Sequence, residues 1–274
     1  MSTTIDTLVI PAAGAGTRLR PATYVTPKEL LRLVDKPIIY YLFAEAYQAG
    51  IRNVLMVTHT DNPQTKRFFQ SGAAKPLLEE FPDLTVSFIE TAKRGGDGQA
   101  LLLAEKAVGD ATFAVTMGDL VTLPGESILE ELIKTHASKN KAVISVEEIP
   151  QEKTGQYGII DPASSAEREY VVHGIVEKPK PHEAPSNLAM TGKYVLPAEI
   201  FKYLHLLERD EGELKLAHAL NMFAKEHTLL ACAVRTKHYD TGTKIDLLKA
   251  EVAFSLAHPE LKDKAPAAIR EMLK

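Results

Sequence analysis

Short apolar runs alternate with helical patterns through the first half of the chain, and this alternation constrains the fold more than any other feature. Apolar residues between Ile38 and Ala49 repeat at helical spacing, with Pro37 as a start signal and Gly50 as a stop signal. Strands that alternate with helices are typical of crossover units on a mostly parallel sheet. We expect strands at residues 5–11, 53–58, 84–90 and 112–117 and a second helix at residues 98–107.

The pattern changes after residue 140, where β-rich segments are separated by Gly, Pro and Ser clusters. This pattern predicts an antiparallel extension of the sheet, followed by helices, one more strand and a helical tail. The chain therefore reads as α/β, with one domain over residues 1–274 that has a nucleotide-type half (1–140) and a second lobe with C-terminal helices (141–274). The expected segments are strands at 141–147, 156–160, 170–177, 190–196 and 228–235, and helices at 197–207, 214–226 and from 243 onward.

Composition excludes several classes of protein. The 274 residues carry 32 basic and 36 acidic side chains, without the basic stripe that would indicate a nucleic-acid partner. No apolar stretch approaches the roughly 18 residues that cross a bilayer, so we expect a cytoplasmic protein with no membrane partner. The single cysteine, Cys232, lies in an apolar run and is expected to be a buried strand thiol.

The stretch PAAGAGTRLRPATYVTPKEL, residues 11–30, follows the first strand and carries glycines and cations. It completes neither a dinucleotide fingerprint nor a Walker loop, because Leu19 stands at the third glycine position and no Lys-Ser or Lys-Thr pair follows. What remains is a loop in which Gly14 and Gly16 allow backbone N–H groups to face an anion, with Arg18 and Lys28 nearby. A plain strand-to-helix turn with surface cations is the alternative.

The segment G-x-G-T-R-L-x-P, followed by P-K-E-L, resembles the signature of sugar-1-phosphate nucleotidyltransferases. The resemblance to the bacterial UTP–glucose-1-phosphate uridylyltransferase family covers nearly the whole chain in the same order. It implies a Rossmann-like, mostly parallel central sheet with a β-rich sugar-binding extension. Further matching segments are LVDKPIIYYLFAEAYQAGI, YGIIDP, GIVEKPKPHEAPSNLAMTGKYVL, GELKLAHAL and YDTGTKIDLLKAEVAFSLAHPEL.

The family reaction, as the resemblance implies it, is an in-line attack of a sugar 1-phosphate on the α-phosphorus of a nucleoside triphosphate, with pyrophosphate as the leaving group. Such a reaction needs positioned cations and no protein nucleophile. The planar guanidinium of Arg18 can contact two phosphate oxygens at once, so Arg18 is assigned to the β- and γ-phosphates beside the glycine loop. Thr17 enters the next turn of this loop. Lys28 is expected to bridge the α-phosphate and the sugar substrate.

Two aspartates are candidate Mg²⁺ ligands, because this cation prefers one or two carboxylates together with phosphate and water oxygens. Asp119 follows a predicted strand at the edge where ligands gather in α/β sheets, and Asp240 opens a second strand-to-helix junction. Each alone could equally be a helix cap or a turn former. The resemblance implies that both are metal ligands.

The resemblance also implies that the sugar phosphate binds in the second lobe. Glu177 would accept hydrogen bonds from sugar hydroxyls and Lys178 would pair with the phosphate, whereas a surface ion pair is the plain alternative. Gly158 and Gly192 match positions where the hexose lies against backbone, although a glycine in a strand can also mark a bulge.

For the base, Ala13 and Gly14 match backbone contacts to the pyrimidine, and Gly96 matches a loop glycine that faces it. The chain departs from the family at Thr91, which stands where relatives carry a glutamine that reads the pyrimidine edge. Threonine offers one hydroxyl in place of an amide, and Gln99 is a candidate substitute. UTP is the expected nucleotide.

Two alternative functions remain open. Thr91 and Gly118 favour a thymidylyltransferase or a relaxed sugar nucleotidyltransferase, and a non-catalytic regulatory paralogue that binds a nucleotide sugar is a rival of another class. His218 replaces a common aspartate of the family and is expected to be structural. The apolar helical stretch from Leu247 to Leu273, together with the resemblance, predicts a homo-oligomer.

Overall fold

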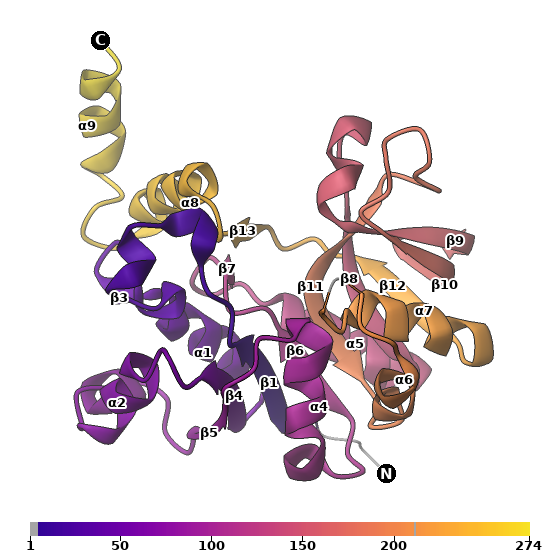
Figure 1. Ribbon diagram of the computed structural model, residues 1–274. Helices are drawn as coiled ribbons and strands as arrows, with labels where there is room; N and C mark the ends of the chain where they lie inside the picture. Colours follow the sequence, from indigo (N-terminus) through magenta and orange to yellow (C-terminus); the bar gives the residue numbers. More distant parts are fainter. Residues whose placement is uncertain (1–4, 211) are drawn as a thin grey trace.

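A nine-stranded sheet runs through the centre of the computed structural model, which describes residues 5–210 and 212–274 (Figure 1). The strand order is β5-β4-β1-β6-β11-β8-β12-β10-β9, with β5, β4, β1 and β6 mutually parallel and β11 antiparallel to both of its neighbours, β6 and β8. The strands are β1 (Thr7–Ala12), β4 (Asn53–His59), β5 (Thr85–Thr91), β6 (Phe113–Thr116), β8 (Ala142–Glu148), β9 (Gly158–Ala166), β10 (Glu169–Glu177), β11 (Leu188–Leu196) and β12 (Leu229–Ala233).

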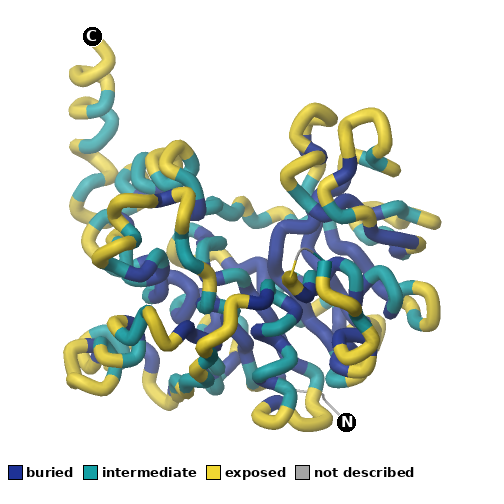
Figure 2. Tube along the Cα trace, viewed as in Figure 1, coloured by how far each residue is buried: buried dark blue, intermediate teal, exposed yellow. Residues whose placement is uncertain are grey.

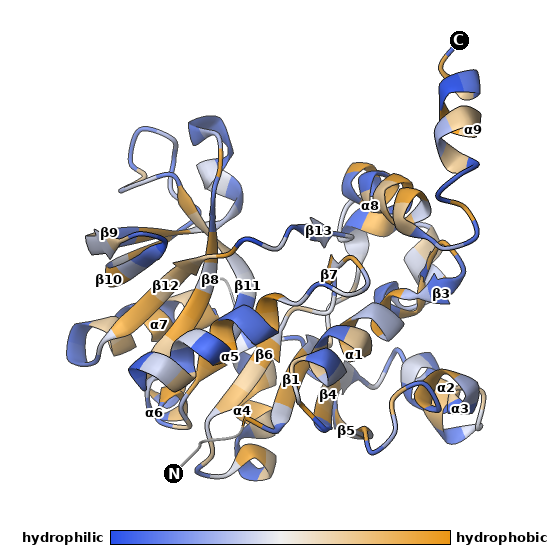
Figure 3. Cartoon of the chain, turned by 180° about the vertical axis from the view of Figure 1, so that it is seen from behind, coloured by the Kyte–Doolittle hydropathy of each residue, from blue (hydrophilic) through white to orange (hydrophobic). Residues whose placement is uncertain are grey.

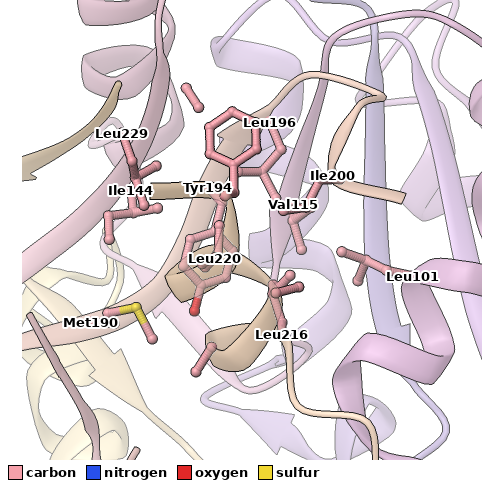
Figure 4. Packing of buried hydrophobic residues seen from close by; sticks show 14 of the residues in the cluster. Leu101, Val115, Ile144, Met190, Tyr194, Leu196, Ile200, Leu216, Leu220 and Leu229 are labelled. Carbon is pink, nitrogen blue, oxygen red and sulfur yellow. The ribbon is translucent and has the colours of Figure 1, made fainter. Parts of the chain in front are cut away.

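Helices cover both faces of this sheet, because successive residues of each strand point to opposite sides. Val9 belongs to one apolar cluster, which includes residues of α4, α6 and α7, and Leu8 belongs to a second, which includes residues of α1, α5 and α8. Figure 4 shows part of the first cluster, and Figure 3 shows the apolar strands between the two helical layers. The helices are α1 (Ile38–Gln48), α2 (Gln64–Gln70), α3 (Lys75–Leu78), α4 (Gly96–Val108), α5 (Ile128–Lys139), α6 (Ile200–Leu206), α7 (Leu216–Glu226), α8 (Lys244–Ala257) and α9 (Ala265–Met272).

The predicted fold class is confirmed, and each predicted strand and helix has a counterpart within a few residues. The largest difference is at the segment expected over 156–160, because β9 continues to Ala166 through its pairing with β10. Antiparallel pairing of β9, β10 and β11 agrees with the expected extension, although β8 and β12 pair in parallel. Cys232 lies in β12 and is 8% exposed, as the apolar run predicts.

Several elements were not predicted from the sequence. The helix α5 begins at Ser127, whose side chain accepts a hydrogen bond from the Glu130 N–H, and the buried Glu45 accepts two more from Ile128 and Leu129. Short strands also form two small pairs outside the main sheet: β2 (Arg32–Leu33) with β3 (Lys36–Pro37), and β7 (Leu120–Thr122) with β13 (His238–Asp240). Four 3₁₀ segments complete the description: η1 (Thr17–Leu19), η2 (Ala22–Tyr24), η3 (Lys28–Leu30) and η4 (Gln151–Gln156).

The sheet and the last long helix connect the two halves of the sequence. The sheet is continuous across residue 140, and α8 returns to the first half, where Phe254 packs against Tyr41 of α1 and Tyr239 of β13. Beyond α8, the helix α9 projects away from the body and has no buried residue (Figures 1 and 2). None of the helices within residues 5–210 and 212–274 combines the length and the apolar character that a bilayer crossing needs.

Candidate active site

The loop after β1 is folded back on itself at its second glycine. Gly16 has φ of 60°, and its carbonyl accepts a 2.8 Å hydrogen bond from the Thr23 hydroxyl before the chain enters η1. A Cβ on Gly16 would lie 2.9 Å from Thr23 Cγ2, so both the backbone angle and the packing favour glycine here. Apart from its chain neighbours, no atom of the described residues lies within 4 Å of the Cβ position of Gly14, which leaves the backbone of the loop open on that side.

A cavity of about 380 Å³ lies against this loop, and we call it the glycine-loop cavity. Six of the residues expected at a nucleotide site line it, whereas Gly16 does not and only shapes the loop. These six are Ala13, Gly14, Thr17, Lys28, Thr91 and Gly96. Gly96 has φ of 85° as the first residue of α4, and a Cβ there would lie 2.5 Å from the Leu214 carbonyl oxygen.

The Thr91 hydroxyl is partly occupied within its own loop. It donates to the Lys93 carbonyl at 3.2 Å and accepts from the Lys93 N–H at 3.1 Å, so its proton is already used. Gln99 also lines the glycine-loop cavity, but its side-chain carbonyl accepts a hydrogen bond from Arg209. Arg94, which was not among the expected site residues, lines this cavity and donates to the Ala13 carbonyl at 2.9 Å.

A second cavity, of about 710 Å³, opens beside β10 and β11, and we call it the β10–β11 cavity. Seven predicted residues line it: Arg18, Asp119, Gly158, Glu177, Lys178, Gly192 and Asp240. Arg18 therefore faces this cavity and not the glycine-loop cavity where it was expected, because η1 turns its side chain away from the loop backbone. The two cavities share Asp97, Met117 and Glu213, so they are adjoining compartments of one site.

The two candidate metal ligands are brought together by the small β7–β13 pair. Asp119 directly precedes β7 and Asp240 ends β13, and the register places Leu120 opposite Asp240. Thr241 fixes this junction, because its N–H and its hydroxyl both donate to the Asp119 carbonyl, at 2.8 and 2.9 Å. Residues that are far apart in the sequence thus share one turn.

Gly242 completes the arrangement by having no side chain. A Cβ there would lie 2.8 Å from Arg18 Nη2 and 2.9 Å from both Asp119 Oδ2 and Asp240 Oδ1. A cation and two carboxylates therefore face one small space. Because Mg²⁺ needs one or two carboxylates and takes its other oxygens from phosphates and water, this donor set fits that ion. No group of three or more His, Cys, Asp or Glu side chains placed to hold a metal occurs in the described part of the chain.

Lys28 and Asp119 form an ion pair between the two cavities, with 2.7 Å between Nζ and Oδ2. Burial by itself raises the pKa of Asp119, but the charge and hydrogen bond of Lys28, together with Arg18, outweigh it and the net pKa is lowered. Burial lowers the pKa of Lys28, and Asp119 more than compensates, so the net pKa is raised. Both groups are held in their charged forms.

The other aspartate has the opposite behaviour. Burial raises the pKa of Asp240, and the nearby negative charge of Asp119 raises it further. Two like charges that crowd one space in this way are stabilised by a cation between them.

On the far wall of the β10–β11 cavity, Lys178 Nζ lies 3.5 Å from Glu177 Oε1, and Lys178 itself adopts a left-handed φ of 48°. The two glycines of this wall are tightly enclosed. A Cβ on Gly158 would lie 2.5 Å from Met190 Cε, and one on Gly192, with φ of 77°, would lie 2.4 Å from Leu120 Cδ1. A side chain at either position would displace Met190 or Leu120, both of which line the cavity.

Asp97 and Tyr194 are among the polar residues of this cavity that sequence reasoning missed. An acidic residue in the first turn of a helix, as Asp97 is in α4, was the available signal, but an acidic side chain there also stabilises the helix by itself, whatever its function. Tyr194 lies in an apolar strand and gave no signal. His218, which lies in α7, lines neither cavity.

The family model described as nucleotidyl transferase matches residues 7–255. The chain belongs to the nucleotidyl transferase family. Among curated members, it is 34% identical to a UTP--glucose-1-phosphate uridylyltransferase of Staphylococcus epidermidis, over 98% of each chain. It is 36% identical to the protein of the same name in Bacillus subtilis, over 93% of this chain and 92% of the relative.

Solved structures of nucleotidyl transferases also resemble the chain. A UTP-bound UGPase from Acinetobacter baumannii has a TM-score of 0.86 at 33% identity, and covers 97% of this chain and 99% of its own. A UDP-glucose pyrophosphorylase complexed with UDP-glucose has a TM-score of 0.84 at 30% identity, over 91% of this chain and 98% of its own. The chain is thus a nucleotidyltransferase in sequence and in fold.

Proposed function

We propose that this nucleotidyltransferase transfers a uridylyl group from UTP to glucose 1-phosphate and releases pyrophosphate. The observation that carries the proposal is the convergence of Arg18, Asp119 and Asp240 around Gly242, on the wall of the β10–β11 cavity. The names of the relatives and the ligands of the similar structures support UTP and glucose 1-phosphate as the two substrates.

In the proposed reaction, a phosphate oxygen of the sugar phosphate forms a bond to the α-phosphorus of the nucleotide. The bond from the α-phosphorus to the bridging oxygen breaks, and pyrophosphate takes that electron pair. The protein holds two mutually repelling anions together and neutralises the charge on the leaving group. Holding the two substrates in adjoining cavities provides the alignment that this displacement needs.

Each charged residue has a proposed role in this arrangement. Lys28, which lines the glycine-loop cavity and contacts Asp119, binds the α-phosphate where the two cavities meet. Arg18 and Lys178 line the β10–β11 cavity, so they bind phosphate oxygens from the sugar side, and Glu177 accepts hydrogen bonds from sugar hydroxyls. The N–H groups near Gly14 and Thr17 face the triphosphate.

Asp119 and Asp240 would hold Mg²⁺ as the cofactor. The ion, when bound, supplies positive charge next to the reacting phosphates. The chain's own contribution is to keep the two carboxylates at one turn, which Thr241 fixes through its two hydrogen bonds to Asp119.

A nucleotide-by-sugar activity matrix tests the proposal. We expect pyrophosphate release from UTP with glucose 1-phosphate and Mg²⁺, loss of release with EDTA, and recovery when Mg²⁺ is restored. Asp119→Asn and Asp240→Asn are expected to lower the rate by on the order of 10²-fold or more. Binding of a nucleotide sugar without any pyrophosphate release would instead support the non-catalytic regulatory paralogue.

The second candidate is glucose-1-phosphate thymidylyl transfer, or a relaxed choice of base. Thr91 favours it, because its proton is used within the loop and it cannot present the donor and acceptor pair of an amide to the base. A kcat/KM for dTTP more than tenfold above that for UTP would replace UTP in the proposal. Similar values for UTP, dTTP, CTP and ATP would establish relaxed specificity.

We also propose that the protein forms a homo-oligomer through its C-terminal helices. Leu248 and Leu256 on α8 are 57% and 42% exposed, and Met272 on α9 is 86% exposed. Unpartnered apolar side chains on adjacent helices favour burial against another copy. Sedimentation of the full chain and of a variant with these three residues changed to serine tests this proposal.

A further inference from the structure

Asp97 lies where the glycine-loop cavity and the β10–β11 cavity meet, and lines both of them. One of its oxygens has a structural role, because Oδ1 accepts hydrogen bonds from the N–H of Gly98 at 2.8 Å and from the N–H of Leu216 at 2.9 Å. The bond from Leu216 ties the start of α7 to the start of α4. The other oxygen, Oδ2, accepts no hydrogen bond from a different residue in the described ranges.

Tyr194 provides a second and independent observation on the same wall. Its side chain comes from β11, is 5% exposed, and lines the β10–β11 cavity. Its hydroxyl has no hydrogen-bond partner among residues 5–210 and 212–274, and it is not fully enclosed by protein, so it is open to the cavity. In Figure 4 the hydroxyl points past the apolar cluster, toward the side of Met190 and Leu216. A polar group left open at a cavity wall indicates that a ligand completes its hydrogen bonding.

The surroundings of Asp97 favour the sugar over the nucleotide. Burial raises the pKa of Asp97, and Glu177 of the β10–β11 cavity raises it further, against the hydrogen bonds from Leu216 and Gly98. Burial also raises the pKa of Tyr194, with added contributions from Asp97 and Glu177. All three side chains line the β10–β11 cavity, and Glu177 and Tyr194 line only this cavity, which is the one proposed for the sugar phosphate.

We propose that Asp97 Oδ2 accepts a hydrogen bond from a ring hydroxyl of the hexose, beside the hydroxyl of Tyr194, and that Asp97 thereby determines which hexose phosphates are used. The inference rests on the proposed function, since it assigns a selective contact within the same site. A buried acceptor that loses its partner is costly, so a sugar that lacks the matching hydroxyl is discriminated against more strongly than its size alone would cause.

Asp97→Asn is the informative variant. The asparagine side-chain carbonyl can keep both hydrogen bonds to Gly98 and Leu216, while the amide nitrogen replaces the charged oxygen at the cavity. Asp97→Leu removes both the hydrogen bonds to Gly98 and Leu216 and the proposed sugar contact. Its loss of stability relative to Asp97→Asn measures the structural role. Asp110→Asn, an exposed residue just after α4, is the matched control for the loss of one negative charge.

The experiment measures kcat/KM for glucose 1-phosphate and its 2-, 3-, 4- and 6-deoxy analogues with wild type, Asp97→Asn and Asp110→Asn. We expect one deoxy analogue to be used at least tenfold less well than glucose 1-phosphate by wild type and Asp110→Asn. With Asp97→Asn, that preference falls to less than threefold. Thermal unfolding verifies that Asp97→Asn remains folded, and binding of inorganic phosphate verifies that the anion site is intact.

Two results would overturn the inference. Equal discrimination among the deoxy sugars by wild type and Asp97→Asn would leave Asp97 with a structural role only. If Asp97→Asn changed the ratio of kcat/KM for UTP to kcat/KM for dUTP, and left the preference among the deoxy sugars unchanged, Asp97 would contact the ribose and not the hexose. Absence of activity with every sugar in wild type would instead count against the proposed function, so the two failures are distinguishable.

Discussion

Lys28 Nζ lies 2.7 Å from Asp119 Oδ2, across a separation of 91 residues. Lys28 belongs to η3, which follows the glycine loop, and Asp119 belongs to the turn that also holds Asp240. This ion pair connects the cations after β1 to the two candidate metal ligands. It also means that the proposed metal ligand and the proposed phosphate ligand are partners before any substrate arrives.

Lys28→Met is expected to abolish most activity and to destabilise the fold. The side chains of Lys28 and Asp119 are 16% and 14% exposed, so the variant leaves a mostly buried carboxylate without its partner, at a cost of about 1–3 kcal/mol. Urea denaturation measures this cost. The double variant Lys28→Met with Asp119→Asn should regain much of the stability and none of the activity. If the double variant is as unstable as Lys28→Met, the pair does not account for the loss.

Gly242→Ala is expected to lower activity by about 10²-fold or more with little change in stability. Gly242 does not have a left-handed backbone, so alanine is tolerated there, but its Cβ would stand within 2.9 Å of Arg18, Asp119 and Asp240. The matched control is Gly155→Ala, where the nearest atom to the Cβ position is 3.6 Å away. Full activity of Gly242→Ala would contradict the convergence on which the proposed function rests.

Lys193→Met is expected to destabilise the protein by about 3–5 kcal/mol. Lys193 of β11 and Glu45 of α1 form a fully buried ion pair, and Glu45 also accepts hydrogen bonds from two N–H groups at the start of α5. Removal of the ammonium leaves a charged Glu45 in the core. The double variant with Glu45→Gln should recover part of the loss in a thermal or urea titration, and recovery of none would argue against the charge as the cause.

Cys232 is expected to resist alkylation in the native protein. Burial raises the pKa of this thiol, so the reactive thiolate is scarcer than in a free cysteine, whose pKa is about 8.5. Because the folded pKa is the higher one, the corresponding stabilisation is present below about pH 8.5 and is lost as the pH rises through the folded value. Iodoacetamide labelling at pH 8, with and without urea, tests the first statement. Rapid labelling without urea would contradict it.

The stability of Cys232→Ala against wild type between pH 7 and 10 tests the second statement. The difference between the two proteins should shift toward the variant as the pH rises. A constant difference would show that the thiol contributes no pH dependence.

The sequence was most informative where the signal is local. The strand that precedes the glycine loop and the helix from Ile38 could be predicted. Their signals, the spacing of apolar residues and the Pro and Gly residues at the ends, lie within a few positions of each element. The strands β7 and β13 could not be predicted, since three residues are too few for a period and their pairing joins distant segments. That pairing places Asp240 beside Asp119, so the most important contact of the candidate site was the least visible one.

The direction of individual side chains was the second feature that could not be predicted from the sequence. Arg18 was expected beside the glycine loop, because its guanidinium suits phosphate oxygens, but after the 3₁₀ turn η1 it lines the other cavity. Asp97 was overlooked, because an acid at the start of a helix is explained by the helix alone. Its second oxygen becomes relevant only after α4, β10 and β11 have been brought together in three dimensions.

The return of α8 to the first half of the chain has a practical consequence for anyone who shortens or fuses this protein. The polypeptide between β12 and α8 carries Asp240, and Phe254 anchors α8 on Tyr41 and Tyr239. Truncation before Phe254 would therefore release the segment that supplies half of the proposed cation ligands, whereas a tag placed after α9 leaves that anchor untouched.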